Sequence, residues 1–170
     1  MIEIKKGRLS DVYKAEQIYN ELFESEAVKC TGWIKGVYPT RDTLLKAFYD
    51  DKLYVLENDG DIVGVARIDT NQVDVYKNVK WKYETDTAFV LHTLVIKPSE
   101  HNKGFASKFV SFYEKLAKEN GCRVLRMDTN AKNKKARALY KKLGYEEAGI
   151  VPCTFNGIPD VMLVCLEKKI

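Results

Sequence analysis

A strand that runs directly into a tight turn and a helix, from Leu94 to Ser107, constrains the fold more than any other stretch of this sequence. Its apolar run stops at Pro98, a residue that fits only at the end of a central strand. A short polar turn follows, and from Gly104 onwards aromatic residues recur at helical spacing. The first N–H groups of a helix have no partner inside the helix, and glycine lets a ligand approach them closely. The stretch therefore predicts an anion site at the turn, with phosphate as the first candidate.

The remaining pattern of apolar residues and turn signals predicts a single α/β domain over residues 1–170. A nearly continuous apolar run at residues 87–96 predicts a central strand that is covered on both faces. Turn residues at 58–61 and 155–158 predict antiparallel hairpins, the second with a type I′ turn. Residues 79–84 alternate apolar and charged side chains, which indicates a half-buried strand or an extended loop. Together these signals predict the order β-α-α-β-β-β-α-β-α-β-β.

Helix boundaries are predicted from capping residues and from glycines that end helices. Ser10 is the expected N-cap of the first helix, and Thr40 or Asp42 is the expected N-cap of the second. The third helix is expected over about residues 104–120, and the last helix over about residues 133–144.

The composition narrows the class of protein. The sequence carries 28 Lys and Arg against 24 Asp and Glu, and this net charge of +4 favours an anionic cofactor but is no nucleic-acid footprint by itself. No apolar run approaches the ~18 residues of a membrane span, and the N-terminus does not resemble a signal peptide, so a cytoplasmic protein without a membrane partner is expected. The four cysteines are widely separated and form no CxxC pair, which predicts reduced thiols and no metal site.

Two segments carry recognisable motifs. Residues 96–98 read IKP and residues 101–106 read HNKGFA. Farther along, residues 133–145 read NKKARALYKKLGY. The first pair resembles V-x-P followed by Q/R-x-x-G-x-G/A, and the later segment resembles N-x-x-A-x-x-L-Y-x-x-x-G-F/Y, both signatures of the GNAT superfamily of acetyl-CoA-dependent N-acetyltransferases. His101 stands where the first motif has Gln or Arg.

The resemblance implies the GNAT fold, a mixed and mostly antiparallel central sheet with a splay between the fourth and fifth strands, flanked by about four helices. It also implies that acetyl-CoA, a co-substrate used without a metal, lies in that splay with its pyrophosphate on the amides of residues 102–107. His101 either donates to phosphate or is merely exposed. The residues implied in cofactor binding are Leu94, Val95, Ile96, His101, Asn102, Lys103, Gly104, Phe105, Ala106, Ser107, Asn133 and Tyr140.

The same resemblance implies catalytic roles for Tyr140 and Asp128. Tyr140 would protonate the departing thiolate of CoA, although it also falls on the apolar stripe of its helix. Asp128 would remove a proton from the acceptor amine, or else cap the turn after its strand. Glu84 and Asp86 are further candidates for this base. His92, inside the apolar strand, is either a satisfied core histidine or a catalyst.

Four aromatic residues predict where the acceptor binds. They are Trp33, Tyr38, Trp81 and Tyr83, and an aromatic-walled pocket suits a small molecule better than a flat protein surface. The implied activity is direct transfer of an acetyl group, in a ternary complex, to a primary amine of an unidentified acceptor, with a small molecule favoured.

Two other functions fit parts of the sequence. One is a catalytically silent sensor of acyl-CoA, which the departure at His101 favours. The other is RNA or ribosome binding through the basic residues at 132–142, although this segment lacks the interleaved aromatic residues of a single-strand binder and is otherwise a solvated helix face. Members of the family are often dimers, so a homodimer is one arrangement that the resemblance implies.

Overall fold

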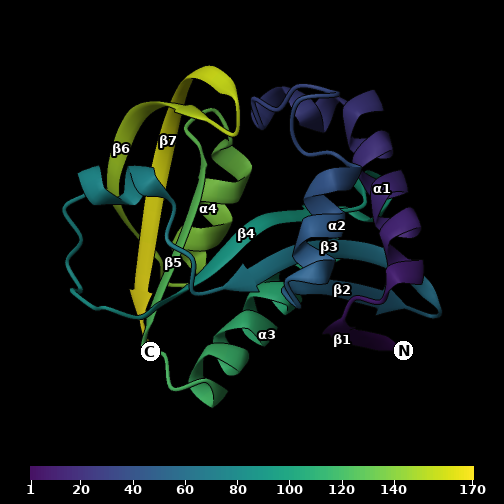
Figure 1. The fold of residues 1–170 in the computed structure, drawn as a ribbon, viewed down its shortest axis with the longest axis horizontal. Coiled ribbons are helices and arrows are strands. Elements are labelled where there is room, and N and C mark those ends of the chain that lie inside the picture. Colours follow the sequence, from purple (N-terminus) through teal and green to yellow (C-terminus); the bar gives the residue numbers. More distant parts are fainter.

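A seven-stranded mixed sheet forms the centre of the computed structural model, which describes residues 1–170 (Figure 1). The strands are β1 (Ile2–Lys6), β2 (Leu53–Asn58), β3 (Asp61–Asp69), β4 (Ala88–Ile96), β5 (Val124–Asn130), β6 (Glu146–Phe155) and β7 (Ile158–Lys169). The helices are α1 (Leu9–Glu24), α2 (Arg41–Tyr49), α3 (Phe105–Glu119) and α4 (Lys134–Lys142), with short 3-10 helices η1 (Glu26–Cys30), η2 (Asp74–Asn78) and η3 (Pro98–Glu100). The strand order is β1-β2-β3-β4-β5-β7-β6, and only β4 and β5 are parallel neighbours. The predicted fold class and element order are confirmed.

Helices cover both faces of the sheet because neighbouring residues of a strand point to opposite sides. In β2, Val55 belongs to the same hydrophobic cluster as Ile18 of α1, whereas Leu56 belongs to the cluster that contains Phe109 of α3. Figure 1 accordingly shows α1 and α2 over one part of the sheet and α3 on the other side. Burying side chains of this size contributes roughly 1.5–3 kcal/mol each. No helix combines the length and the apolar character that crossing a membrane requires.

Both predicted hairpins are present, and both have the type I′ turn that was predicted for the second. Asp59 and Gly60 have φ angles of 50° and 89°, and Asn156 and Gly157 have φ angles of 53° and 77°. Two successive positive φ angles are the mark of a type I′ turn, whose twist matches that of the flanking strands. The turns therefore set the register of β2 with β3 and of β6 with β7.

The segment 79–84 is an extended loop and not a strand. Backbone N–H groups of Lys82 and Tyr83 donate to the carboxylate of Glu167, at 2.7 and 3.2 Å. Arg126 donates to the carbonyl oxygen of Tyr83 at 2.9 Å. Side chains of β5 and β7 thus take the place of a neighbouring strand and hold the loop against the sheet.

One predicted helix start is wrong and another is confirmed. Ser10 lies inside α1, whose N-cap is Arg8, because the carboxylate of Asp11 accepts the backbone N–H of Arg8 at 2.9 Å. Thr40 is the N-cap of α2, and its N–H donates to the hydroxyl of Thr43 at 3.0 Å. In both helices the residue at the third helical position supplies the capping acceptor.

The pairing of β4 with β5 stops partway along both strands. Leu91 and Met127 form the last pair, beyond which β4 pairs only with β3 and β5 only with β7. A bulge adds one residue to β4 at Thr93, which has a φ of 51° that is unfavourable for a β-branched residue. The two halves of the sheet, β1–β4 and β5–β7, run in different directions in Figure 1. The predicted splay between the fourth and fifth strands is confirmed.

Tyr113 of α3 secures the part of the sheet where β4 and β5 still pair. Its buried hydroxyl lies 2.5 Å from the carbonyl oxygen of Phe89 and 3.1 Å from that of Arg126. Tyr113→Phe should lower the free energy of unfolding by about 1–3 kcal/mol, because a buried hydrogen bond is lost. Urea unfolding measures the difference. Tyr13→Phe, at an exposed side chain, is the matched control and should leave stability unchanged. Equal stability of the Tyr113 variant would contradict this role.

Candidate functional site

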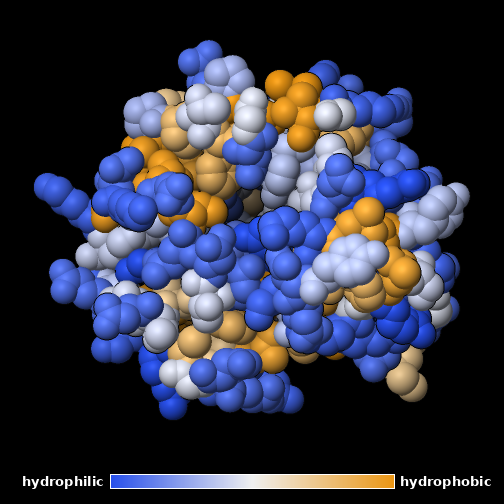
Figure 2. Space-filling view, in the orientation of Figure 1, coloured by the Kyte–Doolittle hydropathy of each residue, from blue (hydrophilic) through white to orange (hydrophobic).

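A cavity of about 700 Å³ occupies the splay between β4 and β5. Its walls come from the diverging ends of the two strands, the N-termini of α3 and α4, the segment after η1, and the β6–β7 hairpin. The surface in Figure 2 is hollowed between that hairpin and the segment after α1, with apolar side chains on both sides. All of the predicted cofactor-binding residues line this cavity except Lys103.

The turn before α3 presents a row of free backbone donors to the cavity. The six consecutive N–H groups from Asn102 to Ser107 donate to no acceptor in the structure. Gly104, the N-cap of α3, has a φ of 78°, and Asn102 has a φ of 66°. These left-handed conformations curl the turn so that its amides point the same way as the positive end of the helix dipole. The arrangement is an anion-binding site.

The positive charge at this turn comes from α4. Lys103 pairs with Glu100 at 2.8 Å and does not line the cavity. Lys135 does line it, and its ammonium donates to the side-chain oxygen of Asn102 at 2.7 Å. The contact between Lys135 and Asn102 could not be read from the sequence, because there Lys135 is one of several basic residues on the same helix.

His101 is only partly exposed, and one nitrogen of its ring is committed to the protein. Its Nε2 lies 2.9 Å from the carbonyl oxygen of Ile96, and because a carbonyl only accepts, this nitrogen is the donor. The imidazole therefore ties the turn back to the last residue of β4. This bond helps to shape the turn from within, whatever ligand it binds.

Asn133 and Tyr140 place α4 beside the cavity. The Oδ1 of Asn133 accepts the N–H of Ala136 at 3.1 Å, which confirms Asn133 as the N-cap of α4. Tyr140 lines the cavity with only 8% of its surface exposed, and its hydroxyl has no hydrogen-bond partner in the protein. Burial, followed by the charge of Asp128, raises the pKa of Tyr140 to about 12. Tyr140 is therefore protonated at neutral pH and has a donor free for a ligand.

Asp128 faces Tyr140 from the end of β5. Its carboxylate accepts the hydroxyl of Tyr76, which η2 brings to 2.7 Å. It makes no hydrogen bond with Thr129 or Asn130, which belong to β5 and not to the turn after it. Burial raises the pKa of Asp128, while the bond from Tyr76 opposes that shift. A carboxyl group with a raised pKa beside a cavity is suited to accept a proton.

Arg67 and Asp69 of β3 and His92 of β4 form a cluster of polar side chains. The sequence pattern singled out His92 but neither Arg67 nor Asp69. His92, which is buried, lies with its Nε2 2.9 Å from Oδ1 of Asp69, in agreement with a satisfied core histidine. Arg67 lies with its Nε 3.0 Å from the other oxygen of Asp69 and lines the cavity. The available signal was an Arg and an Asp two residues apart on one face of an otherwise apolar strand.

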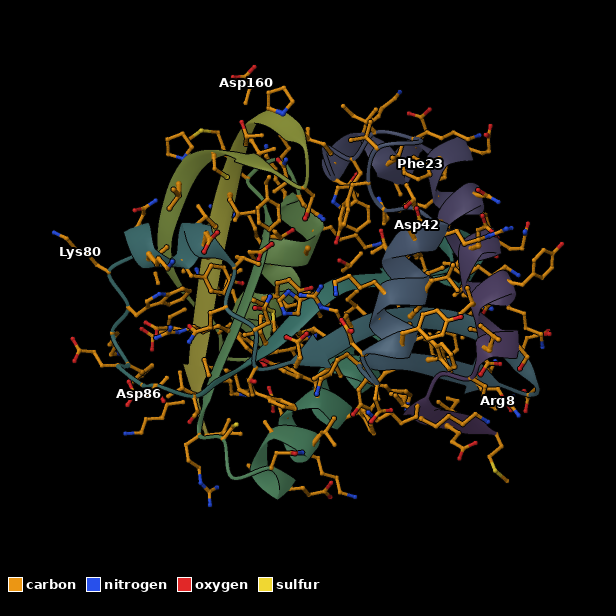
Figure 3. All side chains as sticks on the ribbon, in the orientation of Figure 1. Arg8, Phe23, Asp42, Lys80, Asp86 and Asp160 are labelled. Atoms are coloured by element: carbon orange, nitrogen blue, oxygen red, sulfur yellow. The ribbon has the colours of Figure 1, made fainter.

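Glu84 and Asp86, the alternative bases, are not brought to the cavity. Both side chains are exposed and neither lines it. Figure 3 shows Asp86 at the edge of the molecule, in the loop before β4. Neither residue can exchange a proton directly with a ligand in the splay.

Only two of the four predicted acceptor-binding aromatics reach the cavity. Trp33 and Tyr38 line it, packed edge to face with ring centroids 5.9 Å apart. The Tyr38 hydroxyl also hydrogen-bonds the hydroxyl of Thr93 at the β4 bulge. These two residues therefore form part of the cavity wall, next to the bulge of β4.

Trp81 and Tyr83 lie elsewhere, so this half of the predicted aromatic wall is corrected. The guanidinium of Arg126 stacks 4.1 Å from the Trp81 ring centroid, and the Tyr83 hydroxyl donates to Glu146 at 3.3 Å. Their loop is held at the other end of β5 by the bonds to Glu167 and Arg126. No pattern in the sequence reveals these distant partners.

The cysteines are all free thiols. Cys122 and Cys165 are buried, whereas Cys30 is exposed and lines the cavity. The structure contains no group of three or more His, Cys, Asp or Glu side chains that could hold a metal ion.

Comparison with known proteins agrees with this geometry. The model of the acetyltransferase (GNAT) family matches residues 14–145. The uncharacterized N-acetyltransferase YhfO of Bacillus subtilis (strain 168) is 26% identical over 149 residues, which cover 86% of this chain and 91% of the relative. A splayed sheet with free amides before α3 is in keeping with an acetyltransferase fold, and the family match spans most of the chain. The protein belongs to the GNAT family of acetyltransferases.

Solved structures share the fold. A GNAT-family acetyltransferase from Streptococcus agalactiae 2603 superposes with a TM-score of 0.84 at 20% identity, covering 99% of this chain and 95% of that one. The ribosomal-protein-S18-alanine N-acetyltransferase from Escherichia coli superposes with a TM-score of 0.69 at 17% identity, covering 100% and 94%. At these identities the likeness shows a common fold alone.

Asp128→Asn should raise the melting temperature at pH 7. Because burial raises the pKa of Asp128 in the folded state, the folded protein holds this proton more tightly than the unfolded chain, and stability is lost as the pH rises through the folded-state pKa. Asparagine keeps an acceptor for Tyr76 and removes the charge. The gain should vanish below about pH 4, where the carboxyl is protonated in both states.

Thermal unfolding across this pH range measures the effect. Asp160→Asn, at an exposed residue near the tip of the β6–β7 hairpin (Figure 3), is the matched control and should leave the melting temperature unchanged. A lower melting temperature for Asp128→Asn at pH 7 would show that the ionised carboxylate stabilises the fold.

Proposed function

We propose that this GNAT-family protein transfers an acetyl group from acetyl-CoA to a primary amine of a small molecule, directly within a ternary complex. The observation that carries the proposal is the run of unpaired amides at residues 102–107, on a cavity that also holds the Tyr140 hydroxyl. Such amides bind a pyrophosphate, and a protonated hydroxyl elsewhere on the same cavity can assist a leaving group.

The donor fits the shape of the splay. Its pyrophosphate lies on the amides of the turn, with the Lys135 ammonium beside them. Its pantetheine arm lies along β4 past Leu91, where β4 has no partner on the β5 side. An extended arm can bond to Leu94, Val95 and Ile96 as an added strand would.

The chemistry begins with attack of the neutral amine on the thioester carbon. The developing oxyanion is stabilised by main-chain N–H groups of β4 near the Thr93 bulge, which no neighbouring strand occupies on that side. As the carbon–sulfur bond breaks, the Tyr140 hydroxyl donates a hydrogen bond and then its proton to the thiolate. A free thiol has a pKa of ~8.5, so donation from a tyrosine with a pKa of about 12 is uphill in water. Desolvation by the bound donor and acceptor disfavours the bare thiolate and reduces that difference.

The acceptor must lose a proton before it attacks. An amine with a pKa of ~10.4 is neutral in only about one molecule in a few thousand at pH 7. Asp128 lies on the cavity with a raised pKa and takes this proton directly or through water. Trp33 and Tyr38 enclose the acceptor side, which suits a small molecule.

Titration calorimetry with acetyl-CoA, CoA and ATP tests the donor site first. Acetyl-CoA should bind, and Gly104→Glu should abolish binding, because a carboxylate then lies among the amides that hold the phosphates. Gly104→Gln is the matched control, since it has the same side-chain length and the same backbone strain at a φ of 78° without the charge. It should weaken binding much less. Unchanged affinity in the glutamate variant would place the phosphates elsewhere.

Tyr140→Phe should lower kcat about a hundredfold and leave the affinity for acetyl-CoA unchanged, because it removes only the proton donor to the thiolate. Release of free CoA thiol in the presence of an accepted amine measures kcat. An unchanged kcat would remove Tyr140 from the mechanism. If the wild-type protein binds acetyl-CoA but releases no thiol with any amine, a silent acyl-CoA sensor is the better description.

A further inference from the structure

Arg67 is a partly buried arginine whose hydrogen-bond donors are unused. It lines the acceptor side of the cavity from β3, with 27% of its side chain exposed. Its Nε is fully buried and makes no hydrogen bond of good geometry. Neither of its terminal nitrogens bonds to any other group of the protein. A guanidinium has five N–H donors, and buried donors are rarely left without an acceptor.

Asp69 offsets the charge of Arg67 without using its donors. The Nε of Arg67 is 3.0 Å from Oδ2 of Asp69, which forms an ion pair. The other oxygen of Asp69 already accepts from Nε2 of His92 at 2.9 Å and from the N–H of Asn71 at 2.8 Å. The carboxylate therefore holds the guanidinium in place along one edge. The opposite edge, with the two terminal nitrogens, remains free.

The free edge lies close to the proposed centre of reaction. Arg67 pairs across the sheet with His92, one residue before the bulge at Thr93. Thr93 is bonded to the Tyr38 hydroxyl, and the charges of both Arg67 and Asp128 act on that hydroxyl. A cation and the candidate base therefore flank the same small volume, one on β3 and the other on β5.

We propose that the acceptor carries an oxyanion, a carboxylate or a phosphonate, a few bonds from its amine, and that the terminal nitrogens of Arg67 bind it. This inference rests on the proposed function and names its substrate class, small amino acids and their phosphonate analogues. The planar fork of an arginine matches two oxygens of such a group at once. With the oxyanion on Arg67, the amine is directed to Asp128 and the thioester. Peptide N-termini and lysine side chains, whose nearby carboxyl carbons are in amide bonds, lack this handle.

A panel of matched amines tests the inference. It contains free amino acids, their carboxamides, the corresponding decarboxylated amines and 1-aminoalkylphosphonates, each assayed by thiol release from acetyl-CoA. Oxyanion members should have a kcat/KM at least about tenfold above that of the matching carboxamides, since a charge-assisted bidentate contact is lost in the amide. The ratio of kcat/KM for the carboxylates to kcat/KM for the phosphonates identifies which oxyanion the Arg67 guanidinium fits better. A preference for either one supports the inference.

Two substitutions separate recognition from folding. Arg67→Met should lower kcat/KM for oxyanion members about ten- to a hundredfold, mainly through KM, and change it less than about twofold for carboxamides. Arg67→Lys keeps a positive charge beside Asp69 but has no fork, so it should remain folded and show a smaller preference. Arg123→Met, at an exposed arginine of the same chain, is the matched control and should behave as wild type.

The outcomes distinguish this inference from the function on which it rests. Equal or faster turnover of carboxamides or of an alanyl peptide, or an equal loss for all amines in Arg67→Met, would overturn the role of Arg67. Acetyl-CoA binding without transfer to any oxyanion member would also overturn it and leave the donor site standing. A wild-type protein that does not bind acetyl-CoA in calorimetry would refute the proposed function itself.

Discussion

The parting of β4 from β5 beyond Leu91 and Met127 is the constraint on which the rest of the structure depends. Parallel strands inside a domain normally keep their ladder, because unpaired backbone groups away from water cost free energy. Here each strand keeps a partner on its outer side only, β3 for β4 and β7 for β5. The inner edges then form a cavity with polar backbone walls. Helix α3 follows β4 and helix α4 follows β5, and both helices begin at the end where the two strands diverge. The unpaired N–H groups of their first turns therefore face the cavity as well.

The acidic side chains at and next to this cavity have fixed partners in the protein. Asp128, which lines the cavity, is bonded by Tyr76 of η2, and Asp69, which lies behind Arg67, is bonded by His92 and by the backbone of Asn71. Each acid thus has a fixed partner before any ligand enters, and its orientation needs no reorganisation during a reaction. This arrangement lowers the stability of the folded protein, because a buried carboxyl group with a raised pKa, such as Asp128, is destabilising when it ionises. Sites of this kind commonly trade stability for function.

Local chemistry in the sequence was sufficient for much of the fold and for the turn with free amides before α3. The two hairpin turns require positive φ angles that Asp-Gly and Asn-Gly supply, and the apolar run that ends before Pro98 can only be a buried strand. The N-cap of α4 at Asn133 follows from its short polar side chain. These features depend on residues within a few positions of one another.

Features that depend on distant partners could not be foreseen. Trp81 alternates with charged residues as a strand would, yet its position is decided by Arg126, which stacks on it from β5. Lys103 was expected beside the turn before α3 as a charge for phosphate, but it pairs with Glu100, and Lys135 bonds to the turn instead. Arg67 was overlooked because nothing near it in the sequence shows that β3 faces a cavity at this residue.

The single extra residue in β4 at Thr93 decides which way the end of that strand faces. Before the bulge, Phe89 and Leu91 pack toward α3, and after it Leu94 and Ile96 do so, although an uninterrupted strand would turn these even-numbered residues to the other side. Deleting one residue here would exchange the two faces of the strand end and point apolar side chains away from their core. Related chains can therefore vary in loop length around the sheet, whereas the residue count of β4 between Leu91 and Pro98 is not free to change by one.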